Sequence, residues 1–262
     1  MQEQTIHVFG AILLAHLLGD FPFQSSRLTT LKARHWWAQC WHGAIHLLLL
    51  ILSLRLFAAQ LPVLPVRALT LILAYIAVHV VIDLSKQQII RRGFAGDSAS
   101  TFVLDQALHL ITIFGLTMVL TRTDWGTFPR QAIFSSASEG MILSGAIVYA
   151  GVIFAGGHLI RYMTRGLLRG VSVQLGESVE QLTNAGLYIG WLERLLIVTA
   201  VVLHSPTLIG LILTAKSIAR FPEIKESKFA EYFLIGTLLS VSAALFGGLL
   251  LLKLWYGTVS LQ

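Results

Sequence analysis

The chain has 262 residues, of which 55% are hydrophobic and only 12% are charged. A soluble domain has about a quarter of its residues charged, so this composition excludes an ordinary soluble protein and predicts one that lies in a bilayer. The formal net charge of +6 fits loops next to anionic lipid, and the basic residues are spread too thinly to predict a nucleic-acid partner.

Eight apolar segments follow one another along the chain. A spanning helix needs about 20 mainly apolar residues, and the segments lie at residues 6–23, 38–58, 66–88, 102–121, 141–161, 185–204, 206–220 and 229–252. The seventh is short, follows Ser205-Pro206 and contains Lys216, so a half-helix at 206–220 and seven spans are the alternative. The sequence therefore predicts an all-α, polytopic transmembrane bundle of about eight spans.

The polar segments between the spans indicate how the chain is organised in the membrane. We expect residues 1–121 to form a four-helix, His/Asp-rich membrane domain, and residues 122–262 to add the helices that complete the same bundle. Most Lys and Arg residues fall in loops that follow odd-numbered spans, and cytoplasmic loops keep such an excess. Both termini are therefore predicted on the non-cytoplasmic side.

Each of the first four predicted helices carries two ionisable residues at i, i+4 spacing. Such spacing places both side chains on one helix face, about one turn apart. Successive spans run in opposite directions, and the pairs come alternately late and early in their spans, so all four belong to the predicted cytoplasmic half. The pairs are His16/Asp20, His42/His46, His79/Asp83 and Asp105/His109.

Imidazole nitrogens and carboxylate oxygens together suit a divalent transition metal, and facing helices of a bundle can supply ligands to one centre. We expect zinc, with manganese or iron as alternatives, and one or two ions. The alternative without metal is a buried network in which Asp accepts hydrogen bonds from His. The predicted metal ligands are His16, His42, His46, His79, Asp83, Asp105 and His109.

Two further groups of residues are candidates for catalysis and for substrate binding. Asp20, Asp83 and Asp105 are the candidate catalytic residues, either as the general base that takes a proton from water or as groups that orient an imidazole. Candidates for pairing with an anionic substrate or lipid head group are Lys86, Arg194 and Lys216. A long cationic side chain that reaches the membrane interface is the alternative for each of these three.

Four strings in the first 120 residues or so carry a family resemblance. AHLLGDFPFQ (15–24), WHGAIH (41–46), HVVIDLSK (79–86) and LDQALH (104–109) resemble the bacterial domain of unknown function 3307 family of integral membrane proteins. The resemblance implies a multi-pass protein of the bacterial inner (cytoplasmic) membrane, and it implies no particular reaction. The polar positions characteristic of the family would be His16, Asp20, Gln24, His42, His46, His79, Asp83, Lys86, Asp105, Gln106 and His109.

Three functions are compatible with these observations. The leading hypothesis is a metal-dependent integral membrane enzyme, a hydrolase that acts on a lipid or another membrane-associated substrate at the cytoplasmic face. The second is a metal-ion or proton-coupled transporter, and the third is a non-catalytic membrane protein with a buried His/Asp network. The bilayer and a lipid-like or anionic substrate are the expected partners, and the oligomeric state stays open.

Overall fold

The computed structural model describes residues 2–32, 34–58, 66–124, 126, 138–175 and 179–257. Within these ranges the regular structure is helical and contains no strand, which confirms the predicted all-α class. The elements are α1 (Gln2–Asp20), α2 (Ser26–Lys32), α3 (Trp36–Phe57), α4 (Val66–Arg91), α5 (Ala99–Thr121), α6 (Ser138–Ala150), the π-helical segment η2 (Gly151–Ala155), α7 (Gly156–Leu175), α8 (Val179–Val202), α9 (Pro206–Ala219), α10 (Phe221–Ile224) and α11 (Ser227–Tyr256).

Every predicted span coincides with a helix. Among the described residues, five helical stretches are long and apolar enough to cross a membrane, namely α3, α4, α5, Ser138–Leu167 and α11. The chain is therefore a membrane protein. The predicted short segment at 206–220 is the helix α9, which begins at Pro206, where a proline is favoured because its missing N–H would have no helical partner. The total of eight spans stays a prediction.

Two compact units divide the chain, Met1–Ile147 and Val148–Gln262. The division falls inside α6, whereas we expected one between residues 121 and 122. The first unit thus holds the predicted His/Asp-rich helices together with most of α6.

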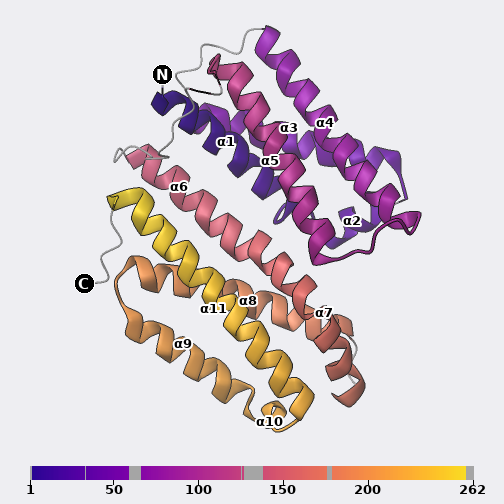
Figure 1. Cartoon of the computed structure of the whole chain (residues 1–262), viewed down its shortest axis with the longest axis vertical. Helices are drawn as coiled ribbons and strands as arrows, with labels where there is room; N and C mark the ends of the chain where they lie inside the picture. The colour runs from indigo at the N-terminus through magenta and orange to yellow at the C-terminus, as the bar shows by residue number, and fades with distance from the viewer. Residues whose placement is uncertain are drawn as a thin grey trace. The chain divides into compact units, whose positions relative to one another are not determined.

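In the first unit, α1 packs against α3 and α5, and α4 packs against α5 and α3 (Figure 1). Each of these helices contributes a side chain that is almost fully buried to one apolar core, namely Ile12, Leu50, Ile72 and Ile113. The His/Asp pairs of α1 and α4 follow the core position along the chain, and those of α3 and α5 precede it. Because the helix directions alternate, the apolar core fills one part of the bundle and the polar residues gather at the other.

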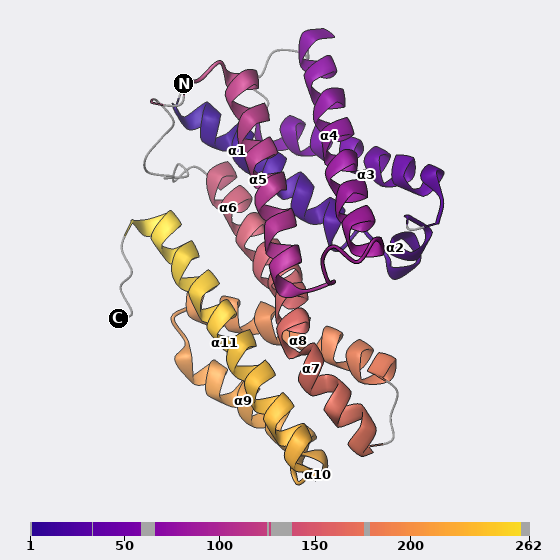
Figure 2. The same ribbon diagram turned by 45° about the vertical axis from the view of Figure 1, so that its right-hand side comes forward.

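The short helix α2 lies at the end of the bundle where α1 ends and α3 begins (Figures 1 and 2). The backbone N–H of Leu28 donates to Ser25 Oγ at 3.2 Å, which caps the start of this helix. Leu28 and Lys32, four residues apart on one face, are the buried side chains of α2. The helix therefore directs a lysine toward the polar end of the bundle.

In the second unit, α11 packs against α8 and α7, and α9 packs against α8 (Figure 2). The approach of α11 to α8 depends on glycine, because a Cβ atom at Gly248 would lie 2.7 Å from Val201. Small residues allow such close packing between membrane helices.

Candidate metal centre

Five histidine rings from four helices meet at the polar end of the first unit. The ring centroids of His46 and His79 are 4.0 Å apart, those of His79 and His109 4.4 Å, and those of His42 and His46 4.5 Å. His16 of α1 joins them at 4.8 Å from the ring of His109. All five rings are buried, with at most 3% of the residue exposed. The i, i+4 pairs predicted to share one site are thus brought together.

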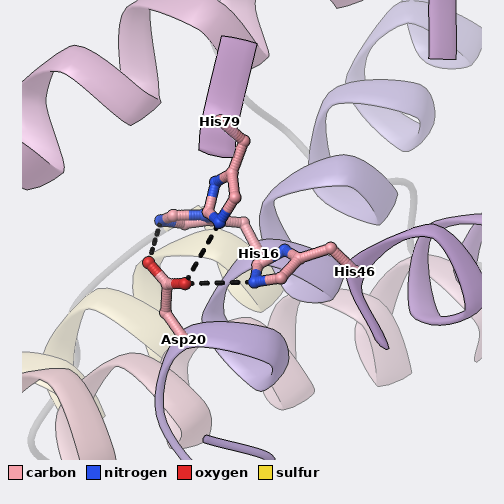
Figure 3. Close-up of side chains that lie close together, drawn as sticks. All are labelled: His16, Asp20, His46 and His79. Carbon is pink, nitrogen blue, oxygen red and sulfur yellow. Dashed lines mark hydrogen bonds and ion pairs between the residues drawn. The ribbon is translucent and has the colours of Figure 1, made fainter. Parts of the chain in front are cut away.

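Asp20 lies among these rings and contacts four of them. Its Oδ1 atom is 3.0 Å from His46 Nε2, 3.3 Å from His42 Nε2 and 3.5 Å from His79 Nε2, and its Oδ2 atom is 3.6 Å from His16 Nε2. Figure 3 shows His16, His46 and His79 directed toward this carboxylate from different sides. Asp20, at the last position of α1, is therefore the common partner of the histidines.

Three groups of side chains place their ligand atoms within 4.8 Å of one another, as metal ligands do. The largest has four members from three helices, a number that suits zinc. A tetrahedral zinc site separates its ligand atoms by about 3.3 Å, since zinc–nitrogen bonds are about 2.0–2.1 Å long. Within that group, Asp20 Oδ1 lies 3.0 Å from His46 Nε2 and 3.5 Å from His79 Nε2, which is near that separation. The groups are His16/Asp20/His46/His79, His42/His79/Asp83 and Asp20/Asp83/His109.

Asp83 links the second and third groups. Its Oδ2 atom is 3.4 Å from His42 Nε2, and its Oδ1 atom is 3.5 Å from His109 Nε2. The ammonium group of Lys32 also donates to Asp83 Oδ2, and at 2.9 Å to Gln24 Oε1. In the sequence, Lys32 is one of the basic residues between the first two predicted spans. Its spacing of four residues from Leu28, which places both on one helix face, is the sequence signal that could have indicated its burial.

Asp105 lies at the edge of the cluster and belongs to none of the three groups found among the described residues. Its Oδ2 atom accepts from Lys86 Nζ at 2.9 Å and from Gln106 Nε2 at 3.1 Å. The nearest approach to a histidine is 3.8 Å, between Asp105 Oδ1 and His109 Nε2. Its predicted role as a ligand thus has weaker geometric support than that of Asp83.

Several buried polar atoms of the cluster have no hydrogen-bond partner in the described chain: His16 Nδ1, His42 Nδ1 and Asp105 Oδ1. Buried polar groups in native proteins are almost always satisfied. The cluster therefore has unused capacity to bind an ion, water or substrate.

Gly19 makes the close approach of α1 to α3 feasible. A Cβ atom at this position would lie 2.5 Å from both Cε1 and Nε2 of His46, well inside van der Waals contact. The glycine directly before Asp20 thus lets the His46 ring reach that carboxylate.

The other two predicted substrate-binding residues, Arg194 and Lys216, belong to the second unit. Arg194 lies on α8 and donates to the backbone carbonyl of Ile153, and Lys216 on α9 donates to Glu193 Oε2 at 2.7 Å. Both line a cavity within that unit. Of the predicted substrate-binding residues, Lys86 is the one that contacts the His/Asp cluster.

Comparison with known proteins gives one match. The family model described as protein of unknown function (DUF3307) matches residues 8–134, which include every histidine and aspartate of the cluster. No curated protein and no solved structure matches the chain.

Proposed function

Through residues 8–134 the chain belongs to the DUF3307 family, and we propose that it is a metal-dependent integral membrane enzyme. The proposed reaction is the hydrolysis of a lipid or another membrane-associated substrate at the cytoplasmic face. One observation carries the proposal: side chains of α1, α3 and α4 place four potential ligand atoms within 4.8 Å in a buried site.

Hydrogen bonding alone restricts this arrangement to particular histidine tautomers. Three Nε2 atoms surround Asp20 Oδ1 within 3.5 Å, and two of them, from His42 and His79, are also 3.3 Å from each other. If both carried a proton, the two N–H groups would face each other. A nitrogen that binds a cation carries no proton, so a cation among these atoms removes the conflict.

The charge of the cluster also favours a cation. Among the described residues, Asp20, Asp83 and Asp105 pair with two ammonium groups, those of Lys32 and Lys86, so with neutral histidines the cluster has one negative charge in excess. An excess of negative charge in a buried site attracts a positive ion, because buried charges need partners. Zinc fits this donor set, and manganese and iron are the alternatives.

The residues of the cluster would have different roles in the proposed reaction. His16, Asp20, His46 and His79 would hold the metal, which when bound supplies a nucleophilic water near neutral pH. Asp83, fixed by Lys32, would hold the rings of His42 and His109 beside the ligands.

Two residues at the edge of the cluster would serve the substrate. Asp105 Oδ1 is buried without a partner and would accept the proton from the attacking water. Lys86 is the most exposed charged side chain of the cluster, with 25% of the side chain accessible, and it would contact an anionic substrate group.

Catalysis is supported over transport by the packing of the first unit. A transporter needs polar groups along a route to both membrane faces, whereas the part of the bundle beyond the cluster is closed by the buried side chains of Ile12, Leu50, Ile72 and Ile113. A route through the bundle would therefore have to cross this apolar core, which favours an enzyme over a transporter.

The experiment is a metal analysis of the full chain. The protein is purified in a non-ionic detergent without a His tag or chelator, and bound metals are measured by plasma mass spectrometry. We expect about one or two equivalents of zinc, manganese or iron. A His46→Ala variant should lose most of it, since losing one ligand costs much of the affinity, while His35→Ala, which removes an exposed histidine, should keep it.

A folded wild-type protein without stoichiometric metal would overturn the proposal. Equal metal contents in the His46→Ala and His35→Ala variants would do the same. If metal is bound, proteoliposomes that show metal flux abolished by His46→Ala would replace the enzyme by a transporter.

A further inference from the structure

The second unit contains a cavity of about 430 Å³ between α7, α8, α9 and α11. Four cationic side chains, Arg161, Arg194, Lys216 and Arg220, line it together with one carboxylate, Glu193. Aromatic side chains cover another part of its wall. The lining is therefore amphipathic, with an excess of positive charge.

Arg194 is a buried cation that pairs with neutral groups. It is 4% exposed, and its Nε and Nη2 atoms donate to the Ile153 carbonyl at 3.2 and 2.8 Å, while Nη1 donates to Ser240 Oγ at 3.3 Å. Ile153 lies in the π-helical segment η2, where the backbone departs from the regular α-helical hydrogen-bond pattern, as often at functional sites.

No carboxylate in the described chain forms an ion pair with Arg194. Glu193 is linked to it through Ser240 Oγ, and a buried charge without a direct counter-ion is costly. Two glycines make room for the guanidinium: a Cβ atom at Gly190 would lie 3.0 Å from Nη1, and one at Gly157 would collide with Nη2. The two glycines therefore leave space for the Arg194 guanidinium, whose positive charge would attract an anion into the cavity.

Glu193 provides a second, independent observation. It is 3% exposed, and its Oε2 atom accepts from Lys216 Nζ at 2.7 Å and from Ser240 Oγ at 3.4 Å. Its Oε1 atom is buried without a partner in the described chain. A carboxylate oxygen accepts hydrogen bonds only, so the missing partner is a hydrogen-bond donor.

Apolar side chains supply the remaining part of the wall. Trp191, Phe229 and Phe233 line the cavity, and Lys216 Nζ lies 5.2 Å from the centroid of the Phe233 ring. Leu192, beside the cavity on α8, is 60% exposed and lies on an apolar helix surface. A ligand with a charged head and an apolar chain matches both parts of the wall.

We propose that this cavity binds the head of an amphiphile that carries a phosphate-type anion next to a hydroxyl or ammonium donor. Arg194 and Arg161 would bind the anion, because guanidinium groups match phosphate oxygens in geometry, and Arg220, which also pairs with Glu223 at 3.1 Å, would add positive charge. Glu193 Oε1 would accept from the donor. Neither the metal nor the His/Asp cluster takes part, so the proposal stands apart from the enzymatic one.

Thermal unfolding of the full chain in a maltoside detergent tests the proposal, with ligands that differ in their head groups. Dioctanoyl phosphatidylglycerol has both the phosphate and the donors, dioctanoyl phosphatidylcholine lacks the donor, and dioctanoylglycerol lacks the phosphate. We expect saturable stabilisation in that order of affinity. Glycerol phosphate has the phosphate and the hydroxyl donors but no chains. If it saturates at a higher concentration than phosphatidylglycerol, the ligand is a lipid; if it saturates at a lower concentration, the ligand is soluble.

Three variants sharpen the test. Arg161→Gln removes an exposed cation at the cavity and should weaken binding of phosphatidylglycerol about tenfold, the worth of one charge-assisted hydrogen bond. Lys253→Gln removes an exposed cation of α11 outside the lining and should leave it unchanged. Glu193→Gln places an amide N–H₂ where Oε1 stood, so phosphatidylglycerol should lose its advantage over phosphatidylcholine.

Equal stabilisation by dioctanoylglycerol and phosphatidylglycerol would overturn the proposal, since the anion would then be irrelevant. Equal losses in Arg161→Gln and Lys253→Gln would overturn it too, because the effect would be one of general charge. If a native phospholipid stays bound through purification, native mass spectrometry should show its mass on the wild type and less of it on Arg161→Gln.

Discussion

At the scale of single residues, the shape of the cluster depends on Gly19, a residue without a side chain that could bind a metal or carry a charge. Gly19 precedes Asp20, which His16, His42, His46 and His79 contact, and it faces the ring of His46. Adding a side chain here changes neither ligands nor charge. A substitution at Gly19 therefore tests the shape of the site without changing its ligand atoms.

Gly19→Ala should displace the His46 ring, destabilise the fold by about 1–3 kcal/mol as overpacking does, and lower the metal content of the purified protein. Gly115→Ala is the matched control, since a Cβ atom at that position of α5 meets nothing within 4 Å. It should be neutral or slightly stabilising, because alanine is the better helix former. Thermal unfolding and metal analysis of both variants check this, and identical metal contents would contradict it.

At the scale of elements, α2 depends on one buried ion pair. This helix of seven residues is too short to be stable alone, and Lys32 attaches it to Asp83 of α4 and to Gln24. The same contact fixes a carboxylate of the cluster. Folding of α2 and order in the site should therefore depend on each other.

Lys32→Met should cost about 3–5 kcal/mol, because it leaves the buried Asp83 without its cation. Amide hydrogens of α2 should then exchange faster. Arg27→Met, on the exposed face of the same helix, is the control and should change little.

A double-mutant cycle identifies the partner of Lys32. The loss caused by Lys32→Met should be much smaller in an Asp83→Asn background, where no buried charge is left unpaired. Thermal unfolding in detergent gives all four stabilities. Additive effects of the two substitutions would show that the pair is not coupled.

At the scale of the whole molecule, exposed tryptophans and basic loops indicate how the chain lies in the bilayer. Near the start of α3, at the polar end of the first unit, Trp36, Trp37 and Trp41 are exposed. Exposed tryptophans gather where a helix meets the membrane interface. This end of the first unit is thus expected at an interface, and the basic loops predict the cytoplasmic one.

Cysteine labelling checks the orientation. In a chain with Cys40→Ala, the sole native cysteine is gone, so Ser26→Cys in α2 and Tyr256→Cys in α11 each give one exposed thiol. An impermeant maleimide added to spheroplasts should label Tyr256→Cys and should label Ser26→Cys only after lysis. The reverse pattern would invert the predicted topology and move the proposed site to the other face.

Much of the fold and part of the site could be predicted because they depend on local spacing. Apolar length defines helices, so each predicted span coincides with one, and i, i+4 spacing puts His16 with Asp20 and His79 with Asp83 on single faces. Alternating helix direction then brings the pairs to one level. The sequence by itself thus determined the helices, the membrane class and the location of the histidine cluster.

Only the tertiary structure decided which residue contacts which. Asp20 as the common partner, Lys32 against Asp83, and Arg194 on the carbonyl of Ile153 depend on helix crossings, rotamers and a π-helical turn. No local sequence pattern predicts these contacts, because each forms between segments that are distant in the sequence and become buried against each other. For the same reason Arg194 and Lys216, grouped with the cluster by their charge, line a cavity within the second unit.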